Sequence, residues 1–107
     1  MAKVIWTEPA LNDLGRVYDY LAASSQSFDV AERICDELLT TSHARIGRSP
    51  KTGSLVAEGK KHGAREIYKH SYRIIYVQRS DACYVVRCIH SSRDLARQLD
   101  PADWPKG

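Results

Sequence analysis

Arginine is unusually common in the β-rich segments of the second half of the chain. Arg65, Arg73, Arg79 and Arg87 all fall inside or at the ends of runs that otherwise read as core strands. Guanidinium groups form paired hydrogen bonds with phosphate oxygens, and His90, at the end of the last run, can exchange a proton near neutral pH. A metal-free ribonuclease needs such groups to activate the 2′-hydroxyl, protonate the leaving oxygen and stabilise the phosphorane. Arg65, Arg73 and His90 are therefore candidate catalytic residues of a nuclease.

Each of these residues also has a plainer interpretation. Arg65 adjoins Glu66, and Arg73 lies on the neighbouring strand, so both arginines can form ion pairs within the sheet. His90 can be a partly buried side chain bonded to a nearby carbonyl. A structure can distinguish the two interpretations. If carboxylates of the same chain neutralise the guanidinium groups, the strands do not offer a basic surface to a partner.

The net charge of +3 over 107 residues hides an uneven distribution. Residues 1–44 carry three basic side chains and seven acidic ones, whereas residues 45–97 carry twelve basic and four acidic. A field concentrated on one part of a small protein indicates a charged partner. The composition suits either an acidic protein surface or a nucleic acid.

Two helices and a sheet must position these side chains. The first half of the chain is expected to form a strand over residues 3–7, a helix capped by Thr7, a break at 24–27 and a second helix capped by Ser27 that ends at Gly47 or Ser49-Pro50. A basic loop is expected over residues 49–63. Strands over 65–67, 72–77 and 83–89 and a helical turn within 94–99 should follow. The first helix is expected to bury an apolar stripe and to expose Asp13, Arg16 and Asp19 on its other side.

This order predicts an α+β fold in which an α-helical hairpin packs on a mostly antiparallel four-stranded sheet (β-α-α-β-β-β). The first strand is expected at a sheet edge, out of sequence order, and the uniformly apolar strand around 73–77 at the centre. Residues 1–107 are expected to form a single domain, with 94–107 as a C-terminal helical turn and tail. Trp104 on this tail is expected to pack over the open sheet face.

Cysteine content and hydropathy point to a cytoplasmic protein without a cofactor. Cys35, Cys83 and Cys88 form no Cys-x-x-Cys pair, so we expect buried reduced thiols and neither a metal site nor another cofactor. No apolar run approaches the ~18 residues that span a bilayer, and the N-terminus lacks the apolar segment of a signal peptide.

Several short motifs occur in an order and spacing typical of one superfamily. They are Val4-Ile5-Trp6-Thr7 before Ala10 and Leu14, then Arg65-Glu66-Ile67, then Tyr72-Arg73-Ile74-Ile75-Tyr76, then His90-Ser91-Ser92-Arg93. Across nearly its whole length the chain resembles the RelE/ParE superfamily of toxins from type II toxin–antitoxin systems. RelE-type members cleave messenger RNA in the ribosomal A site, whereas ParE-type members poison DNA gyrase.

The resemblance is greater to the ParE-like branch, because the expected helical hairpin is long and the spacing from Gly53-Ser54-Leu55-Val56 to Arg65-Glu66-Ile67 is similar to that of this branch. Arg65 and Arg73 match positions of working arginines in RelE-type nucleases, and His90 falls near a histidine of some members. The C-terminal tyrosine of several nucleases has no counterpart, since Asp94 and Leu95 follow Arg93. The resemblance therefore implies a non-enzymatic gyrase inhibitor; the alternative is a ribosome-dependent endoribonuclease.

The partners that the resemblance implies are macromolecules. They are DNA gyrase, or the ribosome under the alternative, and a cognate ParD-like antitoxin that is acidic and partly disordered and forms a hetero-oligomer with the toxin. No membrane partner is expected. The candidate target-binding residues are Arg65, Arg73, Arg87, Arg93 and Trp104.

Overall fold

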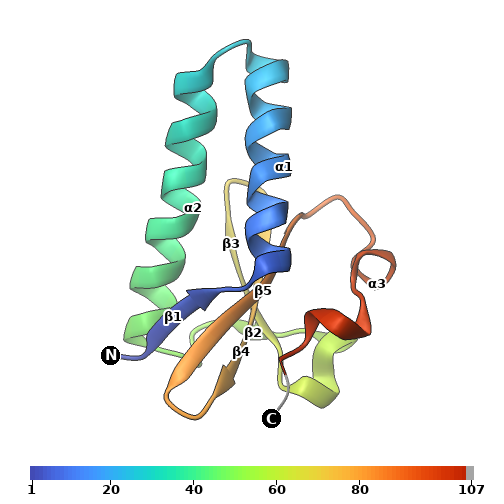
Figure 1. Ribbon diagram of the computed structural model, residues 1–107. Helices are drawn as coiled ribbons and strands as arrows, with labels where there is room; N and C mark the ends of the chain where they lie inside the picture. The colour runs from blue at the N-terminus through green and yellow to red at the C-terminus, as the bar shows by residue number, and fades with distance from the viewer. Residues whose placement is uncertain (106–107) are drawn as a thin grey trace.

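Two long antiparallel helices stand on one face of a mostly antiparallel sheet in the computed structural model, which describes residues 1–105 (Figure 1). In chain order the elements are β1 (Lys3–Trp6), α1 (Glu8–Ser25), α2 (Phe28–Arg48), β2 (Ser54–Leu55), the 3-10 helix η1 (Ala57–His62), β3 (Arg65–Lys69), β4 (Tyr72–Arg79), β5 (Ala82–His90), α3 (Leu95–Gln98) and the 3-10 helix η2 (Pro101–Asp103). The predicted α+β class and the helical hairpin are confirmed.

The strand order of the sheet is β1-β5-β4-β3-β2. β4 is central, and β1 joins an edge out of sequence order, as predicted. β1 runs parallel to β5, while the other neighbouring pairs are antiparallel. The predicted count of four strands was one too few, because Ser54–Leu55 pairs with Arg65 and Glu66 as a short fifth strand. Two residues leave no alternating pattern in a sequence, so this strand had no signal.

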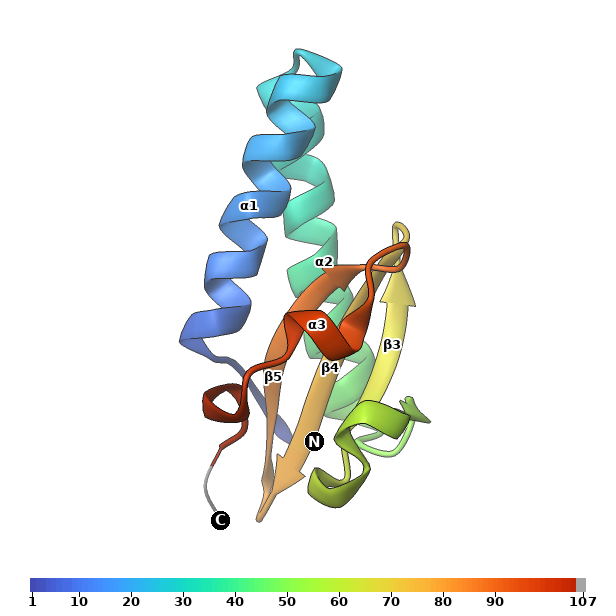
Figure 2. The same ribbon diagram turned by 90° about the vertical axis from the view of Figure 1, so that its right-hand side faces the viewer.

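Local capping sets the ends of the helical hairpin. Thr7 is the N-cap of α1, although its hydroxyl donates to the Val85 carbonyl oxygen at 2.9 Å instead of capping the helix. α1 ends where Gln26 adopts a left-handed backbone with φ of 56°. Ser27 then caps α2 by accepting a hydrogen bond from the Val30 N–H. The short connection makes α1 and α2 lie side by side in both views (Figures 1 and 2).

Each face of the sheet is buried under a different cover. The face under the hairpin forms one core with the helices, and its buried sheet members include Ile74, Tyr76 and Val85. The opposite face forms a second core that includes Ile75 and Val86. Figure 2 shows α3 crossing in front of β4 and β5 on this second face. The sheet is therefore buried on both sides, which explains why its strands read as nearly continuous apolar runs.

The C-terminal segment reaches the second core through Trp104, as predicted for this side chain. The Trp104 ring stacks on His62 of η1, with ring centroids 4.4 Å apart. Gly59 makes room for it, since a Cβ atom there would lie 2.7 Å from the indole. The pKa of His62 is lowered, first by partial burial and then by repulsion from Lys61 and Arg79.

Residues 49–63 are more structured than the loop that their glycines and lysines predict. Besides β2 and η1, the buried Tyr76 hydroxyl holds this segment to the sheet, donating to the Pro50 carbonyl at 2.7 Å and accepting from the Gly53 N–H at 2.9 Å. Gly53 is required at this contact, because a Cβ atom would lie 2.6 Å from the Glu66 carbonyl oxygen. The loop prediction missed a bond between residues 23 positions apart in the sequence.

The three cysteines are free and buried, which confirms the prediction of reduced thiols. Burial raises the pKa of Cys88 to about 12, so its thiol stays protonated at neutral pH. None of the helices within residues 1–105 is long and apolar enough to cross a membrane.

Replacing Tyr76 by phenylalanine tests the anchoring of the 49–63 segment. Tyr76→Phe leaves the Gly53 N–H and the Pro50 carbonyl without their partner, so the free energy of unfolding should fall by about 1–3 kcal/mol. Urea denaturation measures this change. Tyr84→Phe is the matched control on β5, and an equal loss in both variants would contradict the anchoring role.

The lowered pKa of His62 gives the fold a pH dependence. The folded state binds this proton less readily than the unfolded chain, so its contribution is complete above the ordinary pKa of about 6.5. That contribution is lost as the pH falls towards the lower pKa of the folded state. His62→Gln should flatten the fall of the unfolding free energy between pH 7.5 and 5, measured by urea denaturation. An unchanged slope would show that the pKa of His62 does not differ between the folded and the unfolded chain.

Candidate functional site

The second half of β5 lacks a neighbouring strand on its outer side. β1 pairs with β5 only from Ala82 to Val85, and a register shift opposite Ile75 and Tyr76 follows. An open strand edge exposes backbone groups that need partners. Asp13 of α1 supplies one of them, because its Oδ2 atom accepts a hydrogen bond from the Cys88 N–H at 2.9 Å.

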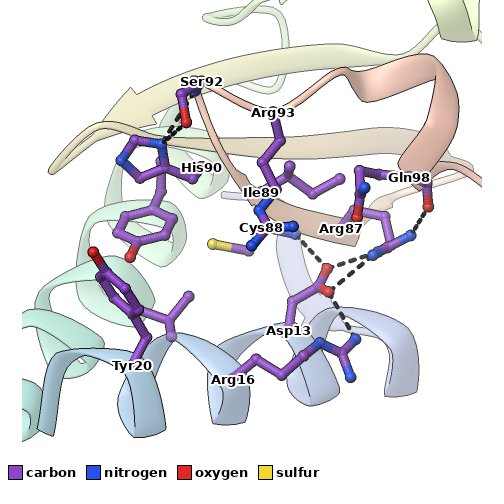
Figure 3. A pocket seen from close by; sticks show the side chains of 12 residues that line it. Asp13, Arg16, Tyr20, Arg87, Cys88, Ile89, His90, Ser92, Arg93 and Gln98 are labelled. Atoms are coloured by element: carbon purple, nitrogen blue, oxygen red, sulfur yellow. Dashed lines mark hydrogen bonds and ion pairs between the residues drawn. The ribbon is translucent and has the colours of Figure 1, made fainter. Parts of the chain in front are cut away.

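The same carboxylate binds Arg87 through two parallel hydrogen bonds. Arg87 Nε donates to Asp13 Oδ2 at 2.7 Å and Arg87 Nη2 to Asp13 Oδ1 at 2.9 Å, and Arg16 Nη2 reaches Oδ1 at 3.1 Å (Figure 3). Asp13 is 4% exposed and Arg87 9%. These hydrogen bonds, first of all those from Asp13, raise the pKa of Arg87 and hold its charge. The expectation that Asp13 faces solvent was wrong.

Arg87 also reaches the C-terminal segment on the other side of the sheet. Its Nη1 atom donates to the Gln98 carbonyl oxygen and to Asp103 Oδ2, the latter at 3.0 Å. Asp103 in turn accepts from the Asp100 N–H at 2.9 Å and so closes η2. One guanidinium group therefore joins the helical hairpin, β5 and the C-terminal segment. We call Asp13, Arg87 and Asp103 the clamp.

A cleft of about 350 Å³ opens beside the clamp, between α1 and the end of β5. Figure 3 shows Tyr20 and Arg16 entering it from α1, with His90, Ser92 and Arg93 on the opposite side. The residues that line it are Asp13, Arg16, Val17, Tyr20, Tyr72, Arg87, Cys88, Ile89, His90, Ser92, Arg93 and Gln98. It therefore combines three arginines with tyrosine, histidine and aliphatic side chains.

The orientation of His90 is fixed by its neighbours. Its Nδ1 atom accepts a hydrogen bond from the Ser92 N–H at 3.1 Å and lies 2.8 Å from the Ser92 hydroxyl oxygen. The neutral ring must then carry its proton on Nε2. Tyr72 meets the ring edge-on, with centroids 5.2 Å apart.

The predicted catalytic residues do not converge on one site. Tyr72 and its neighbour His90 lie on the hairpin face, so Arg73 must point to the opposite face of the sheet. There it forms a paired ion bridge with Glu66, with Nε 3.0 Å from Oε1, and this bridge raises the pKa of Arg73. Arg65 donates to the Gly53 carbonyl at 2.7 Å, a distant part of the sheet.

Carboxylates of the same chain thus neutralise two of the four strand arginines. Arg73 pairs with Glu66 and Arg87 with Asp13 and Asp103, which is the plainer interpretation that the sequence left open. Arg79 is tied to η1 through the His62 carbonyl at 3.2 Å. Buried strand arginines form ion pairs because an unpaired buried charge is costly.

Of the proposed target-binding set, Arg93 remains available for a partner. It is exposed, lines the cleft and forms no ion pair within the described part of the chain. Trp104 is half-buried against His62. The sequence reasoning missed Asp13, Tyr20 and Ser92. The one available signal was that Asp13 lies three residues after Ala10 and four before Val17, which places it on the buried stripe.

Comparisons with known proteins point to one family. A family model described as "ParE toxin of type II toxin-antitoxin system, parDE" matches residues 4–95. Among solved structures, the chain is similar to one described as "Chromosomal ParDE TA system from P. aeruginosa", with a TM-score of 0.69. That match has 14% sequence identity and covers 84% of this chain and 96% of the other, so it supports the fold alone. Curated proteins gave no match.

Removing the charge of Asp13 tests the clamp. Asp13→Asn leaves Arg87 with Asp103 as its one carboxylate partner among the described residues, so the free energy of unfolding should fall by about 3 kcal/mol, near the lower end for a broken buried ion pair. Chemical denaturation measures the loss. Asp19→Asn, on the exposed side of the same helix, is the matched control. A loss in Asp13→Asn no larger than in the control would contradict a structural role for the clamp.

Proposed function

The chain belongs to the ParE toxin family of type II toxin–antitoxin systems, and from this premise we propose that it inhibits DNA gyrase by binding and is neutralised by a ParD-like antitoxin. The proposal places the protein in the cytoplasm, where gyrase acts. The single observation that carries the non-enzymatic mechanism is the separation of Arg73 from His90 by the thickness of the sheet.

A nuclease would need its phosphate-binding and proton-transferring groups within reach of one scissile bond. Here Arg73 is engaged by Glu66 and Arg65 by backbone carbonyls, while His90 lies on the hairpin face beside Tyr72. This arrangement favours the gyrase hypothesis over the ribosome-dependent endoribonuclease.

The charge distribution supports an acidic antitoxin. The basic excess of residues 45–97 survives the internal ion pairs, because it rests on exposed lysines and arginines. Those without an ion pair in the described structure are Arg45, Arg48, Lys51, Lys60, Lys61 and Arg93. Long-range attraction would speed the capture of an acidic, partly disordered segment that orders as it binds.

A supercoiling assay with purified gyrase tests the proposed target. The chain should inhibit supercoiling and increase the amount of cleaved plasmid, because a poison traps the enzyme with cut DNA. Addition of the acidic antitoxin before gyrase should restore supercoiling.

Unchanged supercoiling at a micromolar excess of the folded chain would contradict the gyrase proposal. Primer-extension mapping of messages after expression separates the alternative: new cuts at A-site codons that disappear in His90→Ala would favour the endoribonuclease.

A further inference from the structure

We propose that the cleft between α1 and the end of β5 binds a carboxylate side chain of a protein partner, together with the apolar residue next to it. The inference rests on the proposed function only for the identity of that partner, which would be the acidic antitoxin. The recognition chemistry itself is built from the residues of the cleft shown in Figure 3.

The negative charge inside the cleft is already used. Asp13 accepts four hydrogen bonds, two from Arg87 and one each from Arg16 and the Cys88 N–H. A carboxylate has about four lone-pair sites, so Asp13 has no remaining capacity to bind a cation or a donor from a partner. Its charge is balanced within the clamp.

The positively charged groups of the cleft keep hydrogen-bond donors that are not bound within the cleft. The Arg16 side chain is 69% exposed and spends one nitrogen on Asp13, which leaves its other donors free. Arg93 on the opposite wall is exposed and forms no ion pair within residues 1–105. His90 adds an Nε2–H, since Ser92 fixes the ring by its other nitrogen. Donors from two walls therefore surround one cleft, which is the arrangement that a carboxylate requires.

The size and walls of the cleft indicate more than a lone anion. The volume of about 350 Å³ is far above the ~10–15 Å³ that one water molecule needs. A carboxylate fills a small part of this volume. Val17, Ile89 and the Tyr20 ring supply apolar wall for a neighbouring side chain, and such mixed lining is typical of a recognition pocket.

The surroundings disfavour a nucleic acid in this cleft. Asp19 adjoins Tyr20, and Asp94 adjoins Arg93; both carboxylates are exposed. A polynucleotide carries charge at every step and needs several neutralised phosphates for affinity, so exposed carboxylates next to residues of the cleft disfavour it. A single acidic side chain needs only the donors of Arg16 and Arg93.

A titration of the ¹⁵N-labelled full chain followed by NMR tests the inference. The probes are acetyl-Glu-Leu-amide, its matched control acetyl-Gln-Leu-amide, inorganic phosphate and the dinucleotide pTpT. The glutamate peptide should give saturable shifts at Tyr20, His90 and Arg93. It should bind at least about tenfold more tightly than the glutamine peptide, because a charge-assisted hydrogen bond is lost in the control.

Arg93→Gln should weaken the binding of the glutamate peptide by about tenfold, while the spectrum of the variant stays that of a folded protein. Arg97→Gln, an exposed arginine of α3 outside the cleft, should leave its affinity unchanged. Equal binding of the two peptides, shifts outside the cleft, or no saturation would overturn the inference, as would tighter binding of phosphate or pTpT. If the chain inhibits gyrase but does not bind the glutamate peptide, this inference is wrong and the proposed function stands. If the chain binds the peptide but does not affect gyrase, only the proposed target is wrong.

Discussion

The ion pair between Asp13 and Arg87 is the interaction on which the rest of the structure depends. It closes the part of β5 that β1 leaves open, and through Asp103 it also holds the C-terminal segment. A buried ion pair adds little net stability compared with an apolar pair, but removal of one partner is costly. Its main effect is therefore positional: it fixes α1, β5 and the C-terminal segment relative to one another.

The cleft is a direct consequence of this geometry. β1 ends opposite Val85, and the cleft lies beyond that point, between α1 and the last residues of β5. The clamp fills the inner end of that space and neutralises it. The outer end keeps Arg93 and those donors of Arg16 that do not bind Asp13. The candidate nuclease residues are dispersed over two faces of the sheet, which supports the proposed mechanism of binding without cleavage.

The sequence predicted the features that depend on local pattern. Period and capping residues identified both helices, including the caps Thr7 and Ser27. Alternation with short polar breaks identified the three main strands, and the position of β1 at an edge followed from chain order. The motifs around Arg65, Arg73 and His90 identified the superfamily, and the family model confirms it.

The sequence pattern could not predict contacts between residues that are far apart in the chain. Asp13 and Arg87 are separated by 74 positions, and nothing near either residue indicates its partner. Counting polar residues placed Asp13 with the exposed side of α1, although its spacing from Ala10 and Val17 also fits the buried stripe. The Arg73–Glu66 pair was among the stated alternatives, but only the side-chain geometry selects it over a phosphate-binding role.

A double-mutant cycle with Asp13→Asn and Arg87→Gln measures the clamp most directly. Both residues serve one bond, so the account predicts that the double variant loses less unfolding free energy than the two single variants together, with a coupling energy of about 1–3 kcal/mol. Additive losses, within about 0.5 kcal/mol, would show that Asp13 and Arg87 stabilise the chain independently and would contradict the account.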